Sequence, residues 1–290
     1  MGIIKLFGQG FGTAARKGRM LALLWFIYFL FALLVVAPFY FLLESQFSRS
    51  LLGEKLFAGV DLLWLGDLVY NFQDIPPLLG GCMIGISILF LLLLVFLNGG
   101  IIRRITAAEE RFTLGNFFGD CGRYFGRLFR VFLISLVGYL LIFGILGRFI
   151  SIPFRIWSKG ASTQWTTLAS SSLRLIVLLL LFSIVKMFFD YVKVTLVVED
   201  SRKTVRATLR NFGFLGRRFF KAWALFLLVG LLFVVSTIVY LAVAKALPKT
   251  GVGPPLLFLW QQAYILVRLW IGILFFATEY GFLKSQRPAA

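Results

Sequence analysis

Apolar residues fill six long segments of the chain, and the stretches between these segments hold most of the charges and prolines. The apolar segments are 21–43, 78–97, 128–147, 175–198, 222–244 and 256–278. Each has about the 20 residues that an α-helix needs to cross the hydrocarbon of a bilayer. A helix satisfies its own backbone hydrogen bonds, as a lone segment in lipid must. The pattern predicts an all-α fold, a six-helix transmembrane bundle that forms a single domain over residues 1–290.

The composition excludes a soluble protein and a nucleic-acid-binding protein. Hydrophobic residues make up 60% of the chain, charged residues 14%, and the mean hydropathy is +0.93. The net charge of +18 would suggest nucleic acid in a soluble chain. Here, however, the basic residues cluster at the ends of the apolar segments, where they set membrane orientation. We therefore expect the lipid bilayer, and no nucleic acid, as the partner of this chain.

The distribution of Lys and Arg predicts the orientation. Most of the 30 basic residues lie before the first segment, in the 98–127 and 193–221 connections, or after the last segment. These four stretches fall on one side of a six-span protein. Basic connections stay in the cytoplasm, which predicts that both termini are cytoplasmic.

A short motif, Phe-Gly-x-x-x-Arg, occurs three times, each time just before an odd-numbered apolar segment. Its copies are 11–16, 118–123 and 212–217. The repeat predicts three helical hairpins, 11–97, 118–198 and 212–278, each led in by a basic amphipathic segment. Such a segment lies in the headgroup layer with its aromatic side chains toward the lipid. We refer to these three segments as the lead-ins.

The arginines of the lead-ins allow two interpretations. They are Arg16, Arg123, Arg127, Arg130, Arg206, Arg210 and Arg217. In the first interpretation they only fix the topology and anchor the chain. In the second they recognise anionic phospholipid or another membrane protein.

Charged residues inside the apolar segments are the other candidates for function, because burying a charge in a membrane is costly. Lys186, Asp190 and Lys193 share one helix face by their i, i+4, i+7 spacing. In one interpretation, Lys186 and Asp190 form an ion pair near the end of the segment and neutralise each other. In the alternative, Asp190 couples to an ion or a proton. Arg268 lies near the middle of the sixth segment with no acid nearby in its own helix. We expect Asp190 as its counter-charge, with Arg268 either a structural clamp or a contact for an anionic substrate.

No pattern of catalytic or metal-binding residues is present. The chain has no histidine, which removes the commonest general base and metal ligand. Its two cysteines, Cys82 and Cys121, fall on opposite sides of the predicted membrane. A nucleophile elbow and a phosphate-binding loop are also missing. We expect a protein that is not an enzyme and carries no cofactor or metal.

The stretch Asp190-Tyr-Val-Lys-Val-Thr-Leu-Val-Val-Glu-Asp-Ser-Arg, with Ala207, Leu209 and Phe212 after it, resembles a linker of uncharacterised bacterial multi-pass membrane proteins. Those proteins are similar to the non-catalytic membrane domain of some glycerophosphodiester phosphodiesterases. The resemblance implies a bacterial inner-membrane protein. We expect an accessory or scaffold protein that binds anionic lipid or a partner at its cytoplasmic face. The alternative is a permease or channel-like transporter that uses Asp190 and Arg268.

Overall fold

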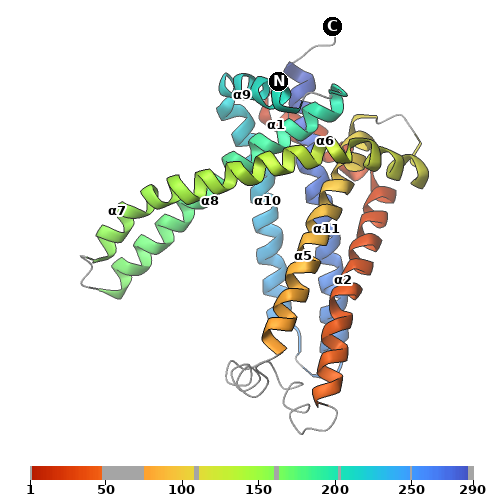
Figure 1. Cartoon of the computed structure of the whole chain (residues 1–290), viewed down its shortest axis with the longest axis vertical. Coiled ribbons are helices and arrows are strands. Elements are labelled where there is room, and N and C mark those ends of the chain that lie inside the picture. The colour runs from red at the N-terminus through yellow and green to blue at the C-terminus, as the bar shows by residue number, and fades with distance from the viewer. Residues whose placement is uncertain are drawn as a thin grey trace. The chain divides into compact units, whose positions relative to one another are not determined.

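The fold of the described residues is entirely helical. The computed structural model describes residues 2–47, 75–107, 111–159, 163–201, 204–248 and 250–286. Nearly all of them lie in helices, and none of them forms a strand (Figure 1). The all-α prediction is therefore confirmed.

Six helices are long and apolar enough to cross a membrane, as the apolar segments predicted. They are α2 (Gly18–Phe47), α5 (Ile75–Thr106), α6 (Leu114–Leu141), α8 (Gln164–Val198), α10 (Phe219–Ala246) and α11 (Gly253–Gln286). Leucine, isoleucine, valine and phenylalanine side chains are exposed along much of their length. A surface of this kind and size suits hydrocarbon and not water. The chain is a multi-pass membrane protein.

The third span is longer than predicted. Helix α6 begins after Thr113, whose side chain accepts a hydrogen bond from the backbone N–H of Asn116 at 3.3 Å. It continues through a π-helical turn (Ile142–Leu146) into α7 (Gly147–Lys159), and the apolar helical segment Leu114–Ser158 has 45 residues. About 20 residues suffice to cross a bilayer. The second lead-in is therefore the first part of the spanning helix and not a separate helix.

Two compact units make up the described chain, residues 22–94 in one and residues 1–21 with 95–290 in the other. In the smaller unit α2 and the first part of α5 pack through aromatic rings. The ring centroid of Phe90 lies 5.5 Å from that of Tyr28 and 5.0 Å from that of Phe31. The prediction that residues 1–290 form one domain stays a prediction.

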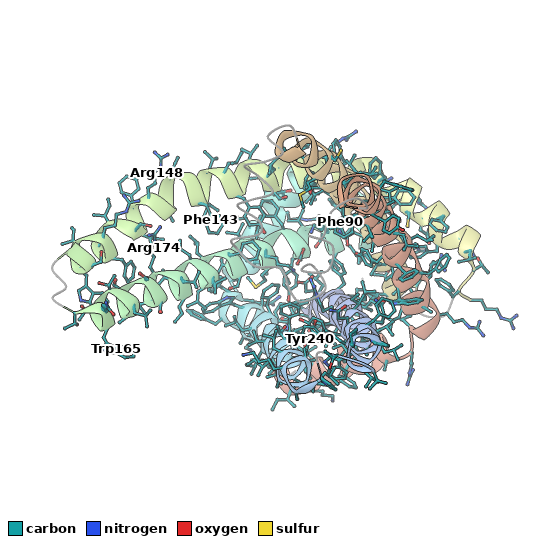
Figure 2. All side chains as sticks on the ribbon, turned by 90° about the horizontal axis from the view of Figure 1, so that it is seen from below. Phe90, Phe143, Arg148, Trp165, Arg174 and Tyr240 are labelled. Carbon is teal, nitrogen blue, oxygen red and sulfur yellow. The ribbon has the colours of Figure 1, made fainter. Side chains whose placement is uncertain are left out.

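The larger unit contains two helical hairpins. Helices α6 and α7 run beside α8, with the ring of Tyr139 stacked on that of Phe182 at 5.6 Å. Figure 2 shows the far half of this hairpin, with Phe143, Arg148, Trp165 and Arg174 labelled. The second hairpin joins α10 to α11, where the rings of Tyr240 and Tyr264 stack at 4.4 Å.

The turn between α10 and α11 follows from its prolines and glycines. Leu247 is extended, as a residue before proline usually is, and this ends α10 ahead of Pro248. Gly251 has a φ of +64°, which glycine adopts without strain. Helix α11 then begins at Gly253, and the two prolines after it lie in the first turn, where their missing N–H groups cost little.

The three lead-ins pack in a cyclic order within the larger unit. Helix α1 (Ile3–Ala15) lies on α11, the start of α6 lies on the end of α5, and α9 (Thr204–Gly216) lies on α8. Each lead-in therefore packs on the second span of the preceding hairpin, and the first lead-in packs on the last span. Helices α1, α9 and the end of α11 lie at the same end of this unit (Figure 1).

Candidate functional site

A cluster of charges lies on the buried face of α8. The Nζ atom of Lys186 lies 2.6 Å from one carboxylate oxygen of Asp190, and the Nζ atom of Lys193 lies 2.8 Å from the other. Asp190 itself is only 3% exposed. The predicted shared helix face and the predicted Lys186–Asp190 pair are confirmed. The two lysines together saturate the carboxylate with charge-assisted hydrogen bonds.

Aromatic rings from two other helices surround the ammonium group of Lys186. It lies 5.2 Å from the ring centroid of Phe226 on α10 and 4.7 Å from that of Phe275 on α11. A cation over the face of an aromatic ring is attracted by the ring quadrupole. Lys186 therefore joins α8 to the α10–α11 hairpin, besides neutralising Asp190.

A second buried carboxylate, Glu279 of α11, completes the cluster. It is 2% exposed, and neither of its oxygens has a hydrogen-bond partner among the described residues. Its charge interacts with those of Asp190, Lys186 and Lys193 across the contact between α11 and α8. The site thus holds two acids and two lysines, and only one of the acids is hydrogen-bonded.

Sequence reasoning missed Glu279, although a signal was present. Glu279 and the tyrosine after it occupy the same place near the end of span six as Asp190 and Tyr191 occupy near the end of span four. Tyr191 is buried, its hydroxyl has no partner among the described residues, and it interacts with Glu279. A comparison of the two acid–tyrosine pairs would have marked Glu279 as equivalent to Asp190.

The predicted pairing of Arg268 with Asp190 is wrong. The guanidinium of Arg268 lies over the rings of Phe233 and Tyr264, at 5.8 Å and 5.9 Å from their centroids. Both oxygens of Asp190 are already bound by the lysines of its own helix. Arg268 also precedes Glu279, which does reach the cluster, by about three turns, or roughly 16 Å along α11. The candidate site of Lys186, Asp190 and Arg268 therefore keeps its first two members and gains Glu279 in place of Arg268.

The repeated motif has a common packing pattern. The residue just before the motif phenylalanine is buried in each copy, as Gly10, Phe117 and Asn211. A Cβ atom on Gly10 would collide with the side chain of Thr278 on α11. Asn211 instead accepts a hydrogen bond from the Thr195 hydroxyl on α8, at 3.1 Å. Each lead-in thus docks through this position on the span beneath it.

The motif phenylalanine also has an equivalent partner in every copy, which is an aromatic ring on the span beneath. Ring centroids lie 4.9 Å apart for Phe11 and Trp270, 6.4 Å apart for Phe118 and Phe96, and 5.3 Å apart for Phe212 and Phe188. The Phe-Gly element therefore contributes to the cyclic packing. Each of these phenylalanines remains 41–70% exposed, so one side of the ring is free.

The lead-in arginines separate into two groups. Arg123 and Arg127 both bind Asp200, at 2.6 Å and 2.5 Å, and Arg210 binds Glu199. The remaining four are exposed and form no ion pair among the described residues. These four, which we call the open arginines, are Arg16, Arg130, Arg206 and Arg217.

Asp200 ties the second lead-in to the end of α8. The hydrogen bond from Arg127, followed by that from Arg123, lowers the pKa of this carboxyl below its ordinary value. The residue has a φ of +46°, in the left-handed region, and the backbone N–H of Ser201 after it closes the helix end on Leu196. Asp200 therefore acts both as a helix stop and as the acceptor for two arginines.

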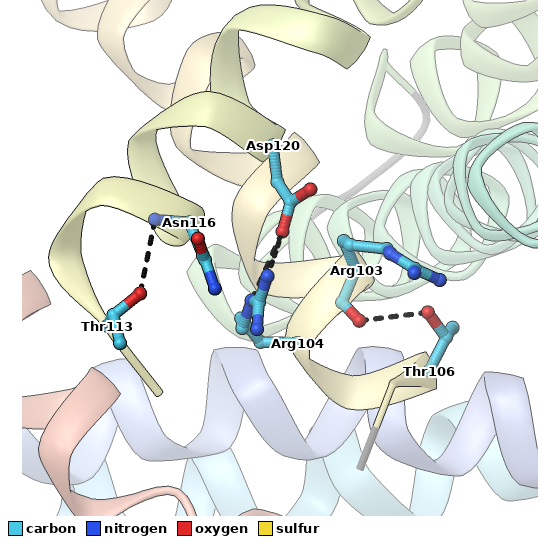
Figure 3. Close-up of polar contacts among 6 residues, drawn as sticks. All are labelled: Arg103, Arg104, Thr106, Thr113, Asn116 and Asp120. Carbon is cyan, nitrogen blue, oxygen red and sulfur yellow. Dashed lines mark hydrogen bonds and ion pairs between the residues drawn. The ribbon is translucent and has the colours of Figure 1, made fainter. Parts of the chain in front are cut away.

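The second lead-in is also tied to α5 by a buried ion pair. Arg104 of α5 binds the carboxylate of Asp120 on α6 (Figure 3); the arginine is buried and the aspartate is half-buried. Burial, together with the charge of Arg104, lowers the pKa of Lys17 at the end of the first lead-in. The charge of Arg104 thus acts on both Asp120 of the second lead-in and Lys17 after the first.

The described residues contain no group of histidine, cysteine, aspartate and glutamate side chains that could hold a metal ion. The four charges of the cluster can hold and exchange protons, and the open arginines can bind anions. Comparison with models of protein families, with curated proteins and with solved structures finds no match to this chain.

Proposed function

We propose that this chain is a non-catalytic bacterial inner-membrane protein whose cytoplasmic face binds anionic phospholipid. The open arginines carry this proposal, because they come from all three lead-ins and are exposed without an acidic partner among the described residues. A basic side chain near an anionic bilayer surface contributes about 1 kcal/mol to binding. Four such residues give a substantial preference for anionic headgroups.

The exposed motif phenylalanines support a bilayer as the ligand. Phe11, Phe118 and Phe212 keep 41–70% of their surface exposed, and an arginine follows each of them in the motif. An apolar ring beside a cation is typical of a helix that lies at the boundary between headgroups and hydrocarbon. A folded partner protein is the alternative ligand for the same face.

The orientation is part of the proposal. The excess of Lys and Arg in the lead-ins and at both termini supports a cytoplasmic location for them. A fluorescent-protein fusion after residue 290 tests it, since such a fusion fluoresces when it folds in the cytoplasm. An active alkaline phosphatase fusion at the same point, with a dark fluorescent fusion, would reverse the orientation.

Native mass spectrometry of the full chain, taken from nanodiscs that contain phosphatidylglycerol and phosphatidylethanolamine, tests lipid binding. We expect the wild type to retain phosphatidylglycerol. The triple change Arg16→Gln, Arg206→Gln and Arg217→Gln should abolish this retention. The matched control changes the same number of arginines in α7 and α8, as Arg148→Gln, Arg155→Gln and Arg174→Gln, and should leave it unchanged.

Two results would overturn the proposal. Unchanged retention in the lead-in triple variant would show that these arginines only set topology, and equal losses in both triple variants would show that no specific face is involved. If the lead-in variant instead loses a co-purified protein while its lipids stay, a partner protein is the ligand.

A further inference from the structure

Glu279 differs from the other described carboxylates of the chain in that it is buried without a hydrogen bond. It is 2% exposed, and both of its oxygens lack a partner among the described residues. Taking an ionised carboxylate out of water without a hydrogen-bond donor is costly, and a bound proton removes that cost. The basic groups whose charges act on Glu279, Lys186 and Lys193, are bonded to Asp190.

The charges around Glu279 nevertheless permit both of its protonation states. With Glu279 ionised, two lysines balance two acids and the cluster is neutral. With Glu279 protonated, the cluster carries one positive charge, and the rings of Phe226 and Phe275 lie against the Lys186 ammonium. Neither state leaves a charge without compensation, and a group with two accessible charge states can exchange a proton.

The titratable groups around Glu279 are few. From α8, the groups whose charge interacts with that of Glu279 are Lys186, Asp190, Lys193 and Tyr191. From the other helices packed on α11, α1 contributes Lys5 and α10 contributes Lys221, and both are exposed. On α11 itself, Lys284 is exposed and Tyr280 is partly buried. Asp190 is already saturated by its lysines, which leaves Glu279 as the carboxylate able to take up the proton.

Helix α1 covers α11 beside Glu279. It packs along α11, where Gly10 lies against Thr278, the residue just before Glu279. Leu6 of α1 belongs to the same apolar core as Tyr191 and Phe282. The helix has 13 residues, and its first turn has no side-chain hydrogen bond at the cap. Its movement away from α11 would open the core beside Glu279.

We infer that Glu279 is a proton-binding site in the interior of the protein, covered by the packing of α1 on α11. This site is independent of the anionic-lipid face. It gives the protein a response to protons that the basic face does not supply.

Infrared difference spectroscopy of the full chain in nanodiscs, recorded over a pH series, tests the inference. The wild type should show the carbonyl band of a buried protonated carboxyl that grows as the pH is lowered. Glu279→Gln should lose this band, and Asp200→Asn, which removes an exposed carboxylate, should keep it. A band that persists in Glu279→Gln, or the absence of any such band in the wild type, would overturn the inference.

A second pair of variants tests the role of α1. Gly10→Ala places a methyl group against Thr278, whereas Gly8→Ala meets nothing within 4 Å on the same helix. We expect Gly10→Ala to exchange the carboxyl proton for deuterium at least tenfold faster than Gly8→Ala does. Equal exchange rates in the two variants would contradict the inference. If Glu279→Gln does not fold, Glu279→Asp replaces it, and an unshifted carboxyl band in that variant would contradict the inference as well.

Discussion

Two carboxylates of this protein, Asp190 and Glu279, are equally buried and are neutralised in opposite ways. The carboxylate of Asp190 forms ion pairs with Lys186, one turn before it on α8, and with Lys193, one turn after it. Glu279 has phenylalanine at both corresponding positions of α11, Phe275 and Phe282, and neither of its oxygens has a partner among the described residues. The charges that act on it, those of Asp190 and of the two lysines, all come from α8.

The comparison distinguishes charges that are paired within one helix from charges that meet only when two helices pack together. The Asp190 cluster assembles as soon as α8 forms, because i, i+3 and i, i+4 side chains are neighbours on a helix. Glu279 gains its environment only when α11 packs on α8. We therefore expect changes at Asp190 to act on the stability of the bundle, and changes at Glu279 to act on its response to protons.

The largest expected effect follows Asp190→Asn. This change leaves two lysines beside an amide that cannot neutralise them. Breaking a buried ion pair by removal of one partner costs several kcal/mol, and partial exposure of the lysines places this case near the lower end, at roughly 3 kcal/mol. Thermal unfolding of the full chain in detergent should show a clear loss of Tm.

Asp200→Asn is the matched control for Asp190→Asn. It also converts an aspartate that binds two basic side chains to asparagine, and asparagine tolerates the left-handed backbone of this position. Because Asp200 is 46% exposed in its ion pairs, its loss should cost far less. Equal losses of Tm in the two variants would mean that the burial of Asp190 does not make its contribution to stability larger than that of Asp200.

A smaller effect is expected for Glu279→Gln at neutral pH. The amide has nearly the shape of the carboxyl and carries no charge, so the variant resembles the protonated state. Its two N–H donors still need partners in a buried site, which limits the change in unfolding free energy to about 1 kcal/mol in either direction. A loss as large as that of Asp190→Asn would show that ionised Glu279 is a structural counter-charge.

The spans and the Asp190 cluster could be predicted because both depend on local sequence. Twenty apolar residues in a row identify a spanning helix without reference to the rest of the chain. Likewise, the spacing of Lys186, Asp190 and Lys193 defines a helix face by itself. The repeated Phe-Gly element could be recognised from the sequence, but its ring partners on other helices could not.

The remaining features depend on contacts between distant segments. Glu279 was overlooked because its charged neighbours are on another helix, and Arg268 was assigned an acid although aromatic rings surround its guanidinium. The ion pairs of Arg123 and Arg127 with Asp200 join segments more than 70 residues apart. No spacing rule connects residues at such separations.

The smallest expected effect is the pH dependence contributed by Asp200. Its pKa is lower in the folded protein than in the unfolded chain, where it is about 3.9. The stabilisation is therefore complete above that value and disappears as the pH falls through the lowered pKa of the folded state. The Tm difference between wild type and Asp200→Asn should be present at pH 7, shrink in acid and shrink in high salt. A difference that grows in acid would contradict the assignment.

The most direct test of the account is a double-mutant cycle at the two buried carboxylates. Glu279→Gln is compared in the wild type and in the Asp190→Asn background by unfolding in detergent. If Glu279 shares the two lysines with Asp190, it becomes their remaining counter-charge when Asp190 is gone. The glutamine change should then cost about 1–3 kcal/mol more in the Asp190→Asn background than in the wild type. Additive effects of the two changes would show that Glu279 and the α8 cluster are energetically separate, and would contradict the account.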